Sequence, residues 1–295
     1  MMTKHFKYLA LLFIAIGMQS CTDVVDLDVD AAPPELVVDG VISNDRELYV
    51  KLSQTSGFFD NNAFEKISGA RVSIFENGQE MSVLDESPNE AGTYLSNFKG
   101  SIGNEYRIRV EISTNAPDQI IGTWWSTADT MKRVPNIDSM GQMSLDRNTN
   151  PQAFFPGEYA VMYFGDFEGK GDYYRLIRSL NDSVFAQENF FITDENLDGF
   201  YFGNGLFPPV SIYGPFEDPE AGEEPDSLGV RLESVTEAFF DYMQVLNTQV
   251  QTGSPFDAPP ALVLGNIHKE NEEGTYAFGY FRVVAGSNAG LRYEP

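Results

Sequence analysis

The side chains that could do chemistry in this sequence are few, and most of them are carboxylates. The stretch DENLDG places Asp194, Asn196 and Asp198 at alternating positions before Gly199, as in the first half of an EF-hand calcium loop. The last ligand position of such a loop would be Gly205 rather than a glutamate, so the stretch does not predict an EF-hand. Two interpretations stay open: a looser Ca²⁺ turn with oxygen ligands, and a plain turn rich in Asp and Asn, which we favour.

Histidine and cysteine are almost absent. His268 is the only histidine after His5, and the polar residues around it predict an exposed turn. This scarcity excludes multi-histidine metal sites and leaves one candidate base for a catalytic triad. Paired carboxylates could still support glycoside hydrolysis, but 44 Asp and Glu residues give no means of choosing a pair. We therefore expect a protein that is not an enzyme and needs no cofactor, with Ca²⁺ at that turn left open and a surface hydrolase as the alternative.

Aromatic residues crowd residues 185–216, a stretch broken by Gly and Pro. Aromatic side chains exposed on loops often form recognition surfaces, whereas buried ones pack beneath the loops. Packing is the favoured interpretation for the stretch as a whole. As the candidate binding surface within it we select Phe200, Tyr201 and Phe202.

The N-terminal residues predict export and a lipid anchor. Lys4 and Lys7 precede an apolar run that is about half the ~20 residues of a spanning helix, which is typical of a signal peptide, over residues 1–20. The tetrapeptide ending at Cys21 resembles a bacterial lipobox, in which the cysteine starts the mature chain and carries acyl groups. Each buried CH₂ contributes about 0.8 kcal/mol, so two or three acyl chains bind a membrane firmly.

An acidic tether over residues 21–34 follows the cysteine. It carries four aspartates: Asp23, Asp26, Asp28 and Asp30. The stretch resembles the acidic export signal of Bacteroidota lipoproteins that are displayed on the cell exterior; the other interpretation is a plain solvated tether. The formal net charge of −25 excludes nucleic acid as a partner, and it excludes an anionic membrane surface except through the acyl chains.

Hydrophobic periodicity predicts a mostly β protein. Residues 48–52 and 106–112 alternate apolar and polar side chains, as half-buried antiparallel strands do. Asn77-Gly78 between two short apolar runs predicts a tight hairpin. We expect an immunoglobulin-like or transthyretin-like sandwich over residues 35–127.

A second β-rich domain is predicted over residues 128–295. Its expected strands lie at 158–166, 172–180, 228–235, 261–267 and 275–284. One helix is expected near 235–250, because Ser234 and Glu237 fit a capping box. Its expected buried face consists of Phe239, Tyr242, Met243, Leu246 and Val250.

Short motifs in a fixed order resemble a family of Bacteroidota lipoproteins catalogued as a domain of unknown function. They are LVVDGVIS at 36, YVKLSQT at 49, GARVSI at 69, GTY at 92, VPNIDS at 134, DYYR at 172, GNI at 265 and GYF at 279. In that family the genes commonly lie beside TonB-dependent receptors. The resemblance implies an outer-membrane lipoprotein, facing the cell exterior, that serves such a receptor by capturing a ligand or as a scaffold. It carries over no active-site residue.

Overall fold

The computed structural model describes residues 33–56, 64–113, 120–146, 148, 155–181, 183–185, 190–205, 207–216, 226–251 and 262–294. The signal peptide, Cys21 and the four aspartates of the tether lie outside these residues. Residues 33–295 form one compact unit. Within the described residues, no helix has the length and apolar character needed to cross a membrane.

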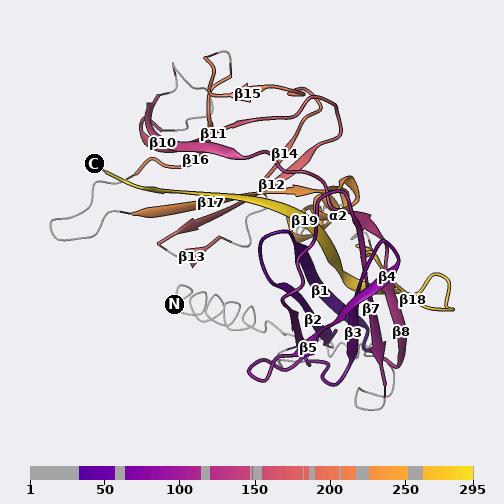
Figure 1. Ribbon diagram of the computed structural model, residues 1–295. Helices are drawn as coiled ribbons and strands as arrows, with labels where there is room; N and C mark the ends of the chain where they lie inside the picture. Colours follow the sequence, from indigo (N-terminus) through magenta and orange to yellow (C-terminus); the bar gives the residue numbers. More distant parts are fainter. Residues whose placement is uncertain are drawn as a thin grey trace, which may run out of the picture. The chain divides into compact units, whose positions relative to one another are not determined.

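Strands dominate the described chain, which confirms the prediction of a mostly β protein with one packed helix (Figure 1). The first large sheet folds around a hydrophobic core. Its strand order is β4-β3-β7-β8-β18-β19-β1-β2-β6-β5, and β9 pairs with β7. The bounds are β1 Leu36–Ser43, β2 Leu48–Gln54, β3 Arg71–Glu76, β4 Gln79–Val83, β5 Asp85–Glu86, β6 Thr93–Ser96, β7 Glu105–Ile112, β8 Gly122–Ser126, β9 Asp129–Thr130, β18 Ile267–Lys269 and β19 Tyr276–Arg292.

The predicted alternation and hairpin of the sandwich are confirmed. In β2 and β7 every second residue is buried. Asn77 and Gly78 join β3 to β4 with positive φ angles of 49° and 84°, a conformation that Asn and Gly tolerate. Local sequence therefore fixes these strands and their turn.

Strand β19 joins the sandwich to a second set of strands. It runs parallel to β1 over residues 278–284 and then antiparallel to β17 (Ser227–Val235) over residues 285–292. Figure 1 shows it as one long yellow strand. Gly279 has a φ of 85°, and a Cβ there would lie 2.0 Å from the carbonyl oxygen of Val38. The close pairing of β19 with β1 therefore requires glycine at this position.

The second set of strands forms two layers around its own core. In one layer β12 (Tyr173–Leu180) pairs with β17, β13 (Ser183–Val184) and β14 (Phe190–Thr193). The other layer consists of β10 (Ile137–Leu145), β11 (Gly157–Gly165), β15 (Tyr201–Phe202) and β16 (Val210–Tyr213). The predicted strands at 158–166, 172–180 and 228–235 are confirmed within one residue. The predicted strand at 261–267 is wrong: of its described residues, 262–267, only Ile267 lies in β18.

The division of the chain at residue 127 stays a prediction. The strand pairs show that the N-terminal sandwich includes residues from far beyond that position, because β18 pairs with β8 and β19 pairs with β1. Side chains of Ile267 and Phe281 belong to the sandwich core. Residues 267–284 therefore build the sandwich together with the strands before residue 127.

Helix α2 spans Glu237–Gln251 and packs against β1 and β19 through Phe239 and Met243. The predicted cap is wrong. Thr236, not Ser234, precedes the helix, and its Oγ1 accepts a hydrogen bond from the Phe239 N–H at 3.4 Å. Ser234 instead lies in β17, paired between two strands.

The buried face of α2 also differs at its far end. Val250 is 78% exposed, so the inward-facing stripe ends before the last turn of the helix. Tyr242 and Leu246 pack as expected against the same cluster of buried residues as Phe239 and Met243, which includes Tyr280. The apolar periodicity is therefore confirmed for all predicted positions except Val250.

Candidate functional site

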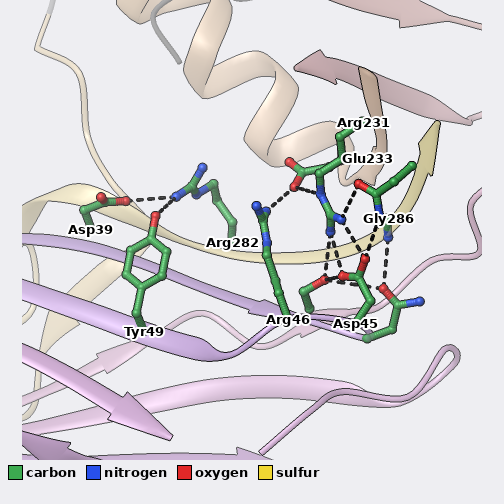
Figure 2. Close-up of polar contacts among 11 residues, drawn as sticks. Asp39, Asp45, Arg46, Tyr49, Arg231, Glu233, Arg282 and Gly286 are labelled. Carbon is green, nitrogen blue, oxygen red and sulfur yellow. Dashed lines mark hydrogen bonds and ion pairs between the residues drawn. The ribbon is translucent and has the colours of Figure 1, made fainter. Parts of the chain in front are cut away.

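A network of arginines and carboxylates occupies the junction between the sandwich and β17 (Figure 2). Asp45 and Arg46 come from the turn between β1 and β2, whereas Arg231 and Glu233 come from β17. In β17 the alternation of side chains places Arg231 and Glu233 on the same face. The sequence separations of 186 and 187 residues across these contacts show that only the tertiary fold creates the site.

Glu233 is the centre of the network. Its side chain is completely buried, and its Oε1 accepts hydrogen bonds from Arg46 Nη2 and from Arg231 Nε, the latter at 2.8 Å. A carboxylate that is buried without partners would be very costly, so the two guanidinium groups make its position tolerable. Removing either partner would leave a charge in a dry environment.

Arg231 ties Glu233 to the turn between β1 and β2. Its Nη1 donates to Asp45 Oδ2 at 2.7 Å, and its Nη2 donates to Asp45 Oδ1 at 2.8 Å and to Ser43 Oγ at 3.0 Å. Asn288 accepts a further hydrogen bond from Nη1 at 3.1 Å. This paired geometry uses the planar fork of an arginine. The hydrogen bonds from Arg231 hold the pKa of Asp45 well below its usual range, although partial burial opposes the shift.

Arg282 extends the network along β19. Its Nη2 donates to Asp39 Oδ1 at 3.0 Å and to the Tyr49 hydroxyl oxygen at 2.9 Å. Arg175 is buried on β12 opposite Glu233. Burial, followed by the charge of Arg282, lowers the pKa of the Arg175 guanidinium.

Positive charge slightly exceeds negative charge in this network. The arginines are Arg46, Arg175, Arg231 and Arg282, and the carboxylates are those of Glu233, Asp45 and Asp39. Guanidinium groups do not release protons in proteins, and the buried carboxylate is already held by two of them. The arrangement suits holding strands together rather than transferring protons.

The structure brings together two of the three predicted calcium ligands. Carboxylate oxygens of Asp194 and Asp198 lie close to each other, with a third from Asp166, and all three oxygens are within 4.8 Å of one another. Asn196 is exposed in the turn between them. Asp166 follows β11 and was not predicted as a ligand, because no local sequence spacing connects it to the turn.

The predicted aromatic surface is only partly a surface. Phe202 is 9% exposed and stacks on Phe164 in the second core, with ring centroids 4.7 Å apart, so its assignment to a binding surface is corrected. Phe200 is half-buried against Phe207, and Tyr201 is exposed. Residues 201 and 202 form β15, and strand alternation turns one ring inward and the other outward.

His268 lies in β18 and is exposed, in agreement with the expected exposure although not with the expected turn.

An apolar pocket of about 430 Å³ lies in the sandwich. Its lining includes Leu36, Trp124, Leu264 and Tyr276. Ligand pockets are usually about 300–1,000 Å³, so this pocket is large enough for a small apolar molecule.

The motifs that carry the family resemblance make specific backbone contacts. In GNI, the Asn266 side chain donates to the Phe281 carbonyl oxygen and accepts from the Phe281 N–H, both at 2.9 Å. In GTY, the Tyr94 hydroxyl donates to the Ile67 carbonyl oxygen at 2.9 Å. The polar side chains of these two motifs therefore fix strands and loops.

Comparison with known proteins agrees with that resemblance. No curated protein and no solved structure matches the chain significantly. One family pattern matches residues 22–288, and its description is a domain of unknown function. The chain therefore belongs to the family DUF4249.

Proposed function

We propose that this chain is a non-enzymatic lipoprotein of the cell envelope. In this proposal acyl chains on Cys21 anchor it in the outer membrane, the acidic tether directs it to the cell exterior, and it serves a TonB-dependent receptor. The lipobox-like N-terminus supports the anchor. The expectation of a TonB-dependent receptor as partner rests on the ordered motifs that resemble a lipoprotein family of unknown function. Membership in DUF4249 agrees with that resemblance.

The buried arginine–carboxylate network is the observation that carries the binding role. It joins the turn between β1 and β2 to β17, while β19 runs through both sets of strands. A frame fixed in this way presents its loops with little loss of conformational entropy on binding, which favours affinity. Its arginines do not release protons, and the carboxylates of Glu233 and Asp45 are held by hydrogen bonds from arginines, so the network favours a structural role over proton transfer.

The receptor interaction is tested by site-specific photo-crosslinking of the full lipidated chain in outer membranes. The crosslinker replaces Tyr201 beside the aromatic loop, or Tyr276 at the rim of the apolar pocket; both are exposed. A control crosslinker replaces the exposed Val184. We expect a TonB-dependent receptor in the product from Tyr201 or Tyr276 and not from Val184. Absence of any such receptor from both positions, or equal capture at Val184, would contradict the proposal.

The anchor and the display signal are tested separately. Cys21→Ser should abolish labelling by a fatty-acid analogue, and equal labelling of the variant would contradict the anchor. Changing Asp23, Asp26, Asp28 and Asp30 to Ala should keep the label but protect the protein from protease added to intact cells. Unchanged cleavage would mean that the aspartates form only a tether.

A further inference from the structure

Three aspartates from separate segments meet beside β11, β12 and β14. Asp166 directly follows β11, Asp194 directly follows β14, and Asp198 lies in the turn before β15. One carboxylate oxygen from each lies within 4.8 Å of the other two. Calcium binds oxygen at about 2.3–2.6 Å, so two ligands on opposite sides of one ion are about 4.6–5.2 Å apart. The three oxygens therefore fit the coordination sphere of a single Ca²⁺.

The buried aspartate of the group has an oxygen without a partner. Asp194 is only 3% exposed, and its Oδ2 is buried without a hydrogen-bond partner in the described structure. An ionised carboxylate in such a place needs a hydrogen bond or an opposite charge to offset the loss of its hydration. The Asp194 carboxylate already lies within 4.8 Å of the other two, so a cation between the three would supply that charge.

No ion pair between described residues neutralises the group. Two basic side chains whose charges act on the neighbouring Asp172 bind backbone oxygens instead: Lys132 Nζ donates to the Gly171 carbonyl at 2.8 Å, and Arg133 Nη2 donates to the Glu168 carbonyl at 3.4 Å. Negative charge is crowded further by Asp172, whose carboxyl is also buried. Burial, and then the nearby carboxylate of Asp166, raises the pKa of Asp172.

The two more exposed carboxylates are held in place by donors from the protein. The Tyr174 hydroxyl donates to Asp166 Oδ1 at 2.6 Å, and the Gly199 N–H donates to Asp166 Oδ2 at 3.1 Å. The Gly169 N–H donates to Asp198 Oδ1 at 2.7 Å. A carboxylate oxygen has lone pairs enough for one such bond and for a metal. The site is therefore oriented before a cation arrives.

We propose that Asp166, Asp194 and Asp198 form a Ca²⁺ site that joins the loop after β11 to the turn after β14. This site is independent of the proposed receptor role. Calcium fits better than magnesium, because Mg²⁺ demands octahedral geometry at about 2.0–2.1 Å and keeps several waters, whereas Ca²⁺ accepts irregular sets of carboxylate oxygens.

The first test is calorimetric titration of the full chain with CaCl₂, together with thermal unfolding in Ca²⁺ and in chelator. The wild type should bind one Ca²⁺ and unfold at a higher temperature when Ca²⁺ is present. Asp194→Asn should lose at least tenfold in affinity and most of the Ca²⁺-dependent shift. Glu195→Gln, which changes the exposed neighbour, should behave like the wild type.

Unfolding in chelator separates a metal ligand from a residue that only supports the fold. Asp194→Asn should be at least as stable as the wild type without Ca²⁺, because it removes an uncompensated buried charge. Asp198→Asn is the second variant: its Oδ1 can still accept from Gly169, so the fold is kept while a charged ligand is lost. A folded Asp198→Asn variant that binds Ca²⁺ as the wild type does would overturn the proposal, as would absence of any Ca²⁺ heat from the wild type.

Luminescence of Tb³⁺, a Ca²⁺ substitute, locates the ion. Excitation of tyrosine should sensitise bound Tb³⁺ through Tyr174, whose hydroxyl contacts Asp166. Excess Ca²⁺ should quench the signal, and Tyr174→Phe should reduce it severalfold. A signal that persists unchanged in both Tyr174→Phe and Asp194→Asn would place the ion elsewhere and overturn the assignment.

Discussion

Two clusters of buried charge lie close together in this fold, and they balance their charge in opposite ways. Around Glu233 the buried carboxylate forms ion pairs with two arginines of the same chain through Oε1, although its Oε2 has no hydrogen-bond partner among the described residues. Around Asp194 the neighbours are other carboxylates, and the described residues supply no ion pair. The first cluster is neutralised by ion pairs within the protein, whereas the second needs a charge from solution.

Strand β12 contributes to both clusters through neighbouring residues. Tyr174 donates to Asp166 in the acidic cluster, and Arg175 lies opposite Glu233 in the arginine network. Successive side chains of a strand point to opposite faces of the sheet, which is why the motif DYYR can serve both.

Glu233→Ala should cause the largest loss of stability. It leaves the Arg46 and Arg231 guanidinium groups beside Arg175 without their central counter-charge, and breaking a buried pair typically costs about 3–5 kcal/mol. The loss should appear in urea denaturation and should be the same with Ca²⁺ or chelator.

The matched control is Glu90→Ala, which removes the exposed pair with Lys51, 2.9 Å apart. Exposed pairs are weakened by hydration and salt, so this change should leave the denaturation midpoint unmoved. Similar losses in Glu233→Ala and Glu90→Ala would mean that the network does not hold the junction.

Arg231→Lys should cost about 2 kcal/mol, because lysine keeps the charge but cannot reproduce the fork that binds Asp45 and Glu233 together. Arg71→Lys is the control, since Arg71 is half-exposed and pairs with Glu80 at the surface. Urea denaturation measures both. An Arg231→Lys variant as stable as Arg71→Lys would show that charge alone, without geometry, supports the network.

The pH dependence of stability should follow Asp45. Its pKa is lower in the folded protein than in the unfolded chain, so its ionised form stabilises the fold above about pH 4, the unfolded value, and that contribution is lost as the pH falls further. Asp45→Asn should therefore be less stable than the wild type at pH 7, and the difference should shrink as the pH falls below 4. Denaturation at several pH values measures it, and a constant difference would contradict the assignment.

Local sequence was sufficient for several strands, although not for the stretch at 261–267, and it was insufficient for the clusters. Period-two alternation in β2 and β7, and the pair Asn77-Gly78, are local signals, and they predicted the right elements. By contrast, Arg46 and Glu233 are separated by 187 residues, and no spacing rule connects them. A hint was present in β17, where Arg231 and Glu233 alternate with the apolar Val230 and Leu232.

The sequence predicted two of the three aspartates of the acidic cluster. The spacing in DENLDG selects Asp194 and Asp198, which the fold does bring together, but Asp166 joins them only because β11 and β14 end near each other. In the aromatic triplet, only the exposure expected for Phe202 is wrong, and for a different reason. The expected surface ignored strand alternation, which sends Phe202 into the core while Tyr201 stays exposed.

The smallest effect expected is that of Tyr174→Phe, and it distinguishes the two clusters most sharply. The change removes the hydrogen bond to Asp166 but keeps the ring, which packs edge-on against Phe164 with centroids 6.2 Å apart. In chelator we expect a loss of about 1 kcal/mol, typical of one hydrogen bond, and a severalfold weaker Ca²⁺ affinity because Asp166 is less well oriented. Tyr49→Phe is the matched change in the arginine network, where it removes the hydroxyl that accepts from Arg282. It should cost a similar amount of stability and leave Ca²⁺ binding unchanged. If both variants altered Ca²⁺ affinity equally, the arginine network and the cation site would be energetically coupled rather than independent.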